Sequence, residues 1–304
     1  MSQIWESFLL GLDYRLQDWR SFDHALFEGY LARMAGLGMG VLRLPLVWAA
    51  FQPEPKRLSD RCLRDLEAAM NTAAAYRVGL VPALFSSEGN GSLRPDWVFQ
   101  EGKPTLEGQV YLLEVLLSYF RGHRAILAWE LNAAGAADPG QVEGWRDYVF
   151  PAVRQADPRH PLALGVGGDE LTGGNRPLLE GLAPHVDLMV IDWTGPHGLA
   201  PLACALAWRL AGKRSLVSVR RAPSGGREAE TLLRGLRKAG ALGVLLPASG
   251  DQTWAGEEHG EALGKVIAEA WVVAEQPAAV AVDPDSFYGD PLAGWETLAR
   301  EWQG

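Results

Sequence analysis

Short apolar runs alternate along the chain with longer segments in which apolar residues recur at helical spacing. The short runs lie at residues 8–14, 40–47, 78–85, 125–132, 161–166, 187–192, 214–219 and 243–246. The helical segments lie at residues 22–36, 59–77, 106–120, 141–156, 177–182, 201–211, 227–239 and 257–274. Strands that alternate with helices predict a parallel sheet, and eight such units close a barrel. The pattern therefore predicts an α/β fold, the (β/α)8 or TIM barrel.

One domain accounts for most of the chain, because no linker or shift in composition divides the eight units. We expect residues 1–275 to form the barrel. From Gln276 the sequence becomes rich in Pro and Asp, and it ends in an amphipathic stretch that contains Trp295 and Trp302. Residues 276–304 are therefore predicted to be an appendage that packs back on the barrel.

Charge and residue usage exclude several classes of function. The net charge is −9, so the chain has no basic footprint for nucleic acid or an anionic membrane. Its two cysteines, Cys62 and Cys204, lack metal-site spacing and cannot form a disulfide framework. We expect buried thiols, no metal and no cofactor.

The sequence gives no sign of export or of a membrane anchor. Residues 1–12 lack the basic start of a signal peptide, and no apolar run reaches the roughly 18 residues that a membrane span needs. We therefore expect a cytoplasmic protein.

The chain contains twelve tryptophans, and their flat rings have two uses. An indole ring can pack against the face of a sugar, or it can fill space in a core. We expect most of the twelve to lie in the layer between the helices and the sheet, and a few to line a cleft.

In this architecture the residues that carry chemistry stand at the C-terminal ends of the strands and in the loops that follow. The second predicted strand reads Val-Leu-Arg-Leu-Pro over 41–45, and the fourth ends in Trp-Glu-Leu-Asn over 129–132. The third exits through Phe-Ser-Ser-Glu-Gly-Asn-Gly over 85–91, and Arg-Pro-Asp-Trp follows over 94–97. In their order and spacing these motifs resemble glycoside hydrolase clan A, in particular family 5 with its cellulases and β-mannanases.

The resemblance implies a retaining glycosidase, but both of its catalytic glutamates are replaced. Family members end strand four as Trp-Glu/Asp-Leu-x-Asn-Glu-Pro, where the last Glu is the acid/base. The match puts Ala134 there, or Ala133 in the neighbouring register. Strand seven usually supplies the nucleophile in Thr-Glu-Phe-Gly, and here the match gives Val219, or Arg220 after a slip of one. A retaining mechanism needs two carboxyl groups about 5–5.5 Å apart, and none of these residues supplies one.

Three other acids are candidates for the missing carboxylates. Asp192 ends the sixth predicted strand and faces the mouth, so it is the strongest candidate for a general acid/base; capping or ordering a loop is the alternative. Glu88 lies in the third loop, where a solvated surface acid is the alternative. Glu130 alternates with Asn132 and should point into the barrel, where a buried ion pair with Arg43 is the alternative.

Further polar and aromatic residues near the predicted mouth are candidates for contacts to a saccharide. They are Tyr14, Arg43, Trp48, Asn132, Trp193, His197, Arg220, Asp251 and Trp254. Asp251 can alternatively fix the turn at residues 249–251. A phosphate site also stays open after strand seven, where Arg220, Arg221 and Arg227 lie close together.

Three hypotheses for function follow from these residues. The first is a family-5-like pseudoenzyme that keeps a cleft for an oligo- or polysaccharide or for a protein partner. The second is an active glycoside hydrolase with displaced carboxylates, in which Asp192 acts with Glu88 or Glu130. The third is a scaffold protein without a ligand.

Overall fold

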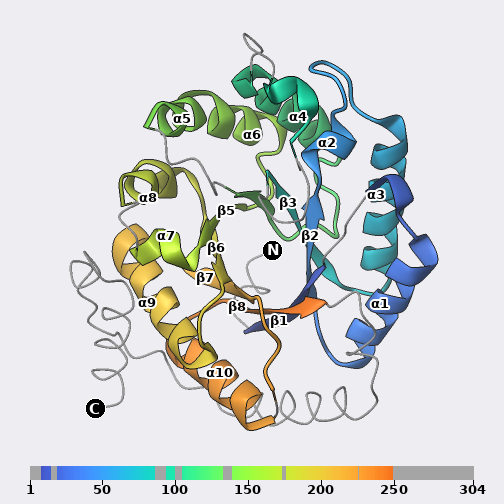
Figure 1. The fold of residues 1–304 in the computed structure, drawn as a ribbon. Coiled ribbons are helices and arrows are strands. Elements are labelled where there is room, and N and C mark those ends of the chain that lie inside the picture. Colours follow the sequence, from blue (N-terminus) through green and yellow to red (C-terminus); the bar gives the residue numbers. More distant parts are fainter. Residues whose placement is uncertain are drawn as a thin grey trace.

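Eight parallel strands close into a barrel in this computed structural model, and the helices surround it (Figure 1). The structure describes residues 8–14, 19–85, 94–99, 105–132, 139–172, 176–224 and 226–248. Each strand pairs with its neighbours in chain order, and the eighth pairs with the first to close the sheet. The predicted (β/α)8 fold is confirmed. The helix expected over 257–274 and the appendage expected over 276–304 lie outside the described residues.

The strands coincide closely with the apolar runs that predicted them. They are β1 (Leu9–Tyr14), β2 (Val41–Leu46), β3 (Gly79–Leu84), β4 (Trp129–Asn132), β5 (Leu162–Gly167), β6 (Leu188–Trp193), β7 (Ser215–Val219) and β8 (Gly243–Ala248). The largest difference is β4, which was expected over 125–132. Before it, the chain pairs with β3 only at an isolated bridge between Leu80 and Ile126. The backbone therefore joins the regular ladder later than the apolar run begins.

Seven predicted helical segments fall within the described residues and are found, one of them divided. The helices are α1 (His24–Gly36), α2 (Trp48–Phe51), α3 (Asp60–Ala75), α4 (Thr105–Tyr119), α5 (Pro139–Gly144), α6 (Phe150–Ala156), α7 (Gly168–Thr172), α8 (Arg176–Leu182), α9 (Ala200–Ala211) and α10 (Gly226–Lys238). The short helices α2 and α7 were not predicted. The single helix expected over 141–156 is divided by a π-helical turn at Trp145–Val149. Pro151 lacks the N–H that a regular helix would need there, and the Phe150 amide bonds to Trp145 five residues back.

Side chains of the strands separate into two buried layers because they alternate between the two faces of the sheet. The inner layer is apolar over the lower half of the barrel and contains Leu9, Val41, Val81, Ala163, Val190, Leu216 and Leu245. The outer layer packs under the helices and includes most of the described tryptophans, as expected. Trp208 does not belong to this layer, because its side chain is exposed. A residue's parity along its strand therefore decides whether its side chain reaches the barrel interior.

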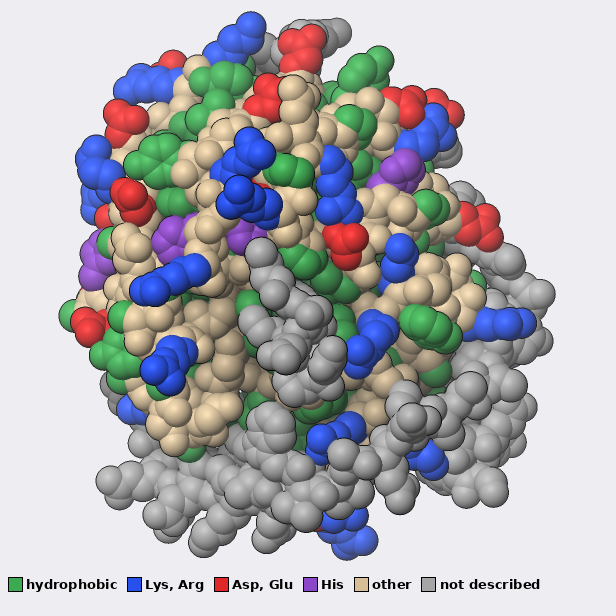
Figure 2. Space-filling model, turned by 180° about the vertical axis from the view of Figure 1, so that it is seen from behind, with side chains coloured by type: hydrophobic (Ala, Val, Ile, Leu, Met, Phe, Trp, Pro, Cys, Tyr) green, Lys and Arg blue, Asp and Glu red, His purple; other side chains and the backbone are tan. Residues whose placement is uncertain are grey.

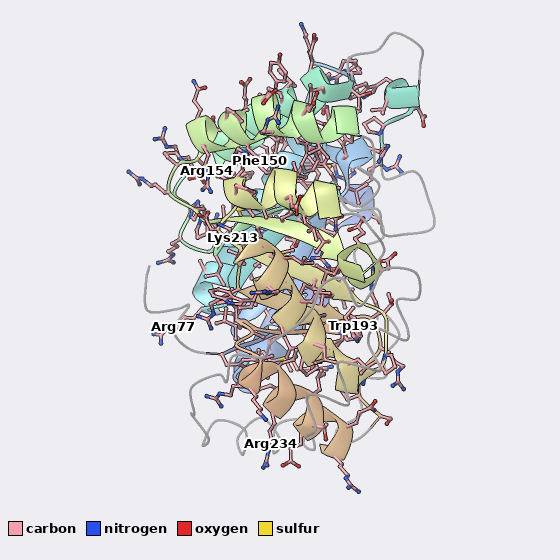
Figure 3. The ribbon with its side chains drawn as sticks, turned by 90° about the vertical axis from the view of Figure 1, so that its left-hand side faces the viewer. Arg77, Phe150, Arg154, Trp193, Lys213 and Arg234 are labelled. Carbon is pink, nitrogen blue, oxygen red and sulfur yellow. The ribbon has the colours of Figure 1, made fainter. Side chains whose placement is uncertain are left out.

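The two ends of the barrel are called here the mouth, where the strands end, and the N-terminal face, where they begin. Figure 3 shows Trp193, at the end of β6, on one side of the molecule. Arg77 and Lys213, which precede β3 and β7, lie on the opposite side. The helices run from the mouth back to the N-terminal face, so their C-terminal ends lie on that face.

Cys62 and Cys204 are buried thiols, as expected. Burial raises the pKa of the Cys204 thiol to about 12, so this group stays protonated and unreactive at neutral pH. In the described part of the chain, no helix combines the length and the apolar character that a bilayer span requires.

The start of α1 gives a test of the local structure. Asp23 is its N-cap, and the carboxylate accepts a hydrogen bond of 3.0 Å from the Leu26 amide. We expect Asp23→Ala to lower the free energy of unfolding by about 1 kcal/mol, measured by urea denaturation, because that amide loses its partner. Asp23→Asn is the matched control, since its amide oxygen still accepts. An equal loss in both variants would contradict the capping role.

Candidate functional site

A buried ion cluster occupies the barrel interior below the mouth, with Arg43 of β2 at its centre. The guanidinium binds Glu130 of β4 through two hydrogen bonds, Nε to Oε2 at 2.7 Å and Nη2 to Oε1 at 2.5 Å. It binds Asp192 of β6 through Nη1 at 2.6 Å and Nη2 at 3.2 Å. Nη1 also reaches Asp13 of β1 at 3.1 Å. One cation thus joins carboxylates from three strands.

Two polar residues complete this cluster. The Ser218 hydroxyl of β7 donates to Asp13 Oδ2 at 2.6 Å, and the Asn132 amide donates to Asp192 Oδ2 at 3.4 Å. All six side chains have the inward parity of their strands, which places them in one layer. We call this set the Arg43 cluster; its members are Asp13, Arg43, Glu130, Asn132, Asp192 and Ser218.

A glycine on β5 leaves room for the central ion pair. A Cβ atom built at Gly165 would lie 2.4 Å from Glu130 Oε1 and 3.0 Å from the Asn132 amide nitrogen. No larger residue fits there without moving the carboxylate. The glycine-rich sequence of β5 therefore serves the packing of Glu130 against Arg43.

The cluster has more carboxyl groups than cations, and this changes their ionisation. Burial raises the pKa of Glu130 to about 7, although the charge of Arg43 opposes the shift. Burial also raises the pKa of Asp192, again against the effect of Arg43. For Arg43, burial disfavours the charged form, but Asp192, Glu130 and Asp13 outweigh it and raise its pKa. Near neutral pH the Glu130 carboxyl is therefore partly protonated.

The two acids of this cluster that were candidates for catalysis differ in their access to solvent. Glu130 has no exposed surface, and its contact with Arg43 is the buried ion pair that the sequence offered as its alternative role. Asp192 retains 7% exposure, so it lies nearest to the mouth. It is bound to Arg43 and Asn132, and its role as a general acid/base stays a prediction.

Strand β7 corrects one of the two alignments made from sequence. Ser218 points inward, so its neighbour Val219 points outward, and Val219 packs in the outer hydrophobic layer with 1% exposure. The register that assigned Val219 to the axis-facing nucleophile position is therefore wrong. The Arg220 amide donates to Trp193 O at 2.9 Å, which continues the pairing with β6 and gives Arg220 the inward parity. The described residues of β7 contain no carboxylate.

Tyr14 also differs from its prediction as a residue of the cleft. It follows the inward-facing Asp13, so its ring lies on the outer side of the sheet. There it packs edge-on against Phe27 and Tyr30 of α1, at centroid distances of 5.5 and 5.3 Å. Burial raises the pKa of its hydroxyl to about 12. Tyr14 is therefore a packing residue between β1 and α1.

Three other predicted contact residues are buried in the walls of the mouth. Trp48 donates to Gln52 Oε1 at 2.6 Å, and Trp193 donates to Pro196 O at 2.9 Å. The ring nitrogens of His197 lie 2.7 Å from Glu228 Oε1 and from Arg221 O. Each of the three residues is at most 4% exposed. Their contact with a saccharide stays a prediction, and it would require the loops of the mouth to move.

Several predicted positions cannot be compared with the structure. Glu88, Ala133, Ala134, Asp251 and Trp254 lie outside the described residues. Within the described ranges, no three His, Cys, Asp or Glu side chains are arranged to hold a metal ion. Sequence reasoning missed Ser218 and gave Asp13 no role. Both residues could have been found from strand alternation, because Asp13 lies on the same face of β1 as Gly11, and Ser218 on the same face of β7 as Arg220.

Comparison with known proteins gives a close match in fold and a weak one in sequence. No family model matches the chain. A β-xylosidase of Phanerodontia chrysosporium is 27% identical over 142 residues, which is 42% of this chain and 29% of that protein.

Solved structures of family 5 enzymes share the barrel. A GH5_18 enzyme of Bifidobacterium longum subsp. longum, in complex with Manβ1-4GlcNAc, has a TM-score of 0.78 at 14% identity, with 98% of this chain and 89% of that chain covered. A GH5_18 enzyme of Streptomyces cattleya, in complex with GlcNAc, has a TM-score of 0.75 at 15% identity, covering 97% and 87%. An endo-1,4-β-mannanase of Eisenia fetida has a TM-score of 0.64 at 15% identity, covering 90% and 93%. At these identities the likeness establishes the fold.

The raised pKa of Glu130 makes stability depend on pH. The folded state holds this proton up to about pH 7, whereas the ordinary value is 4.5, so the folded state binds more protons between these values. Stability from this group is therefore complete below pH 4.5 and is lost as pH rises to 7, by an amount on the order of 3 kcal/mol. We expect Glu130→Gln to flatten this fall in urea denaturation at pH 5, 6 and 7.

A surface variant serves as the control for this experiment. Glu143 lies exposed on α5, and Glu143→Gln removes one carboxylate without touching the Arg43 cluster. It should keep the pH dependence of the unmodified protein. If Glu130→Gln and Glu143→Gln gave the same slope between pH 5 and 7, Glu130 would not be the group that binds the proton.

Proposed function

We propose that this chain is a family-5-like barrel without retaining glycosidase activity, and that its mouth binds a saccharide or a protein partner. The observation that carries the proposal is the state of the inward-facing acids on β4 and β6. Glu130 and Asp192 are both bound to the Arg43 guanidinium and almost completely buried. The resemblance to family 5 therefore extends to the scaffold, and the chemistry at its centre is different.

The distance between the two carboxylates does not decide the question. Arg43 Nη2 bonds to Glu130 Oε1 and to Asp192 Oδ2, so these oxygens lie at most about 6 Å apart. A retaining pair stands about 5–5.5 Å apart, but the glycosidic bond must lie between its two members. In this barrel the guanidinium lies there instead. Its charge also opposes the positive charge that develops on the sugar in the transition state.

Strand β7 supports the same conclusion. The nucleophile of the family stands at the end of this strand, and here the inward positions are Ser218 and Arg220. Ser218 is completely buried and donates its hydroxyl hydrogen to Asp13. An arginine at the next inward position cannot attack an anomeric carbon. Neither residue can form the glycosyl–enzyme bond that a carboxylate forms.

The proposed ligand follows from the proteins that share the fold. Their structures contain Manβ1-4GlcNAc or GlcNAc, and others of these proteins are a β-1,4-mannanase and an exo-β-1,4-mannosidase. In (β/α)8 barrels, ligands bind at the C-terminal ends of the strands. We therefore infer that a β-linked manno-oligosaccharide is the first ligand to test at the mouth.

One observation favours the alternative of an active hydrolase with displaced carboxylates. The pKa of Glu130 is about 7, and that of Asp192 is also raised. A raised pKa suits a carboxyl group that acts as a general acid at neutral pH. For this chemistry Arg43 would have to release Asp192, and a second carboxylate such as Glu88 or Glu130 would have to face it.

Hydrolysis and binding assays distinguish the two functions. We expect no turnover of mannan, cellulose or aryl β-glycosides, together with saturable binding of Manβ1-4GlcNAc in calorimetric titration. Turnover that Asp192→Asn abolishes would overturn the proposed loss of catalysis. Asp147→Asn, at an exposed position on the π-helical turn, is the control for nonspecific effects. Absence of saccharide binding would remove the saccharide from the proposal.

A further inference from the structure

The net negative charge of this protein comes from its C-terminal residues, 251–304. Of the 37 acidic and 28 basic residues in the chain, 11 acidic and 2 basic residues lie in 251–304. Residues 1–250 therefore contain equal numbers of both, and the net charge of −9 belongs to the last part of the chain. Within 276–304 a single cation, Arg300, accompanies the acids Asp283, Asp285, Asp290, Glu296 and Glu301.

Four basic side chains lie together on one part of the N-terminal face. Lys213 and Arg214 precede β7, and Arg237 and Lys238 end α10 just before β8. Arg214 Nε donates to Gly240 O at 3.3 Å, so the two connecting segments lie side by side. Neither segment, 212–214 or 237–242, contains an acidic residue. We call these four side chains the basic patch.

Cations continue around the same face. Exposed arginines lie near the ends of other helices on that face, at Arg33, Arg77, Arg121, Arg124 and Arg159. Figure 2 looks onto this face and shows several Lys and Arg side chains on it, with Asp and Glu side chains among them. In Figure 3, Arg77, Arg154 and Lys213 project on this side, away from Trp193. Cations in the last turn of a helix interact favourably with the helix dipole, and this accounts for basic residues at helix ends. Lys213 and Arg214 lie beyond the end of α9, after its C-cap Gly212, so the dipole does not account for them.

The topology brings the acidic segment to this face. Strand β8 ends at Ala248 at the mouth. The sequence predicts the eighth helix over 257–274, and a helix in this fold runs antiparallel to the strands, from the mouth to the N-terminal face. On this expectation from the sequence, residue 276 would follow the helix at the N-terminal face, the end of the barrel that carries the basic patch. Its neighbour in the ring of helices is α10, the helix that ends in Arg237 and Lys238.

We propose that residues 276–304 dock on the basic patch through their carboxylates. An extended chain spans about 3.3 Å per residue, so every acid of the segment can reach the patch. Exposed ion pairs contribute at most about 1 kcal/mol each, so docking needs several of the five acids at once. A tethered segment also has a local concentration in the millimolar range, which favours it over a separate acidic peptide. The basic patch lies at the opposite end of the barrel from the mouth, so docking there is independent of the proposed function.

Zero-length carbodiimide cross-linking of the full-length protein tests this directly. The reagent joins a lysine amine to a carboxylate in direct contact, and the basic patch contains Lys213 and Lys238. We expect mass spectrometry to find both lysines joined to acids between 283 and 301. Lys56 follows β2 on the mouth side and is the internal control, which should give no such product. Products from Lys56 in equal yield would overturn the proposal.

Salt and matched variants make the test specific. At 1 M salt the screening length falls to about 3 Å, and the yield at Lys213 and Lys238 should fall at least tenfold. Arg214→Gln with Arg237→Gln should lower that yield several-fold at low salt. Arg57→Gln with Arg61→Gln, at exposed positions beside the start of α3, should leave it unchanged. A yield that neither salt nor the first pair changes would contradict charge-driven docking.

A mixture of isotopically light and heavy protein identifies the occupant of the patch. Docking within one chain gives cross-linked peptides that are wholly light or wholly heavy. Mixed peptides would show that a second copy supplies the segment, and this would overturn docking within one chain. Circular dichroism of each variant checks that the barrel remains folded, so that a loss of product reports on the contact.

Discussion

The upper half of the barrel interior depends on one guanidinium with three carboxylates around it. Arg43 connects β2 to β1, β4 and β6, which are not all neighbours in the sheet, through side chains that have almost no contact with water. Buried charges are tolerated only when they are paired and hydrogen-bonded, so each member of the cluster constrains the others. Gly165, Ser218 and Asn132 are needed around it because a larger or apolar residue would displace or desolvate a charge.

The same constraint separates the scaffold from the chemistry that this scaffold supports elsewhere. A hydrolytic barrel keeps its acids accessible at the mouth and leaves space between them for a sugar. In this chain the acids of β4 and β6 point at an arginine and are closed off from solvent. Similar backbones can therefore differ completely in what their centres can do, and kinship of fold alone does not carry activity.

Local patterns in the sequence were sufficient for the architecture. The alternation of short apolar runs with helical segments located all eight strands. The contact of Glu130 with Arg43 was also foreseeable, because both residues have inward parity on strands near the mouth. These inferences need only the periodicity of a strand or helix and the chemistry of one side chain.

Long-range geometry was harder to obtain. That Asp192 shares the guanidinium with Glu130 depends on the stagger of β6 against β2 across the barrel, which no local pattern records. The directions of Tyr14 and Val219 depended on strand parity, and one residue of slip reverses the face. An aromatic residue at a strand end looks the same in the sequence whether it lines a cleft or packs under a helix.

The parity of β7 also limits how this barrel can change. A glutamate that replaced Val219 would enter an apolar layer under the helices, where an unpaired carboxylate is strongly disfavoured. Near the mouth, the axis-facing positions of β7 are Ser218 and Arg220, and the first already supports Asp13. A carboxylate designed into the axis-facing side of β7 near the mouth would therefore have to stand at residue 220, beside the acids that Arg43 already holds.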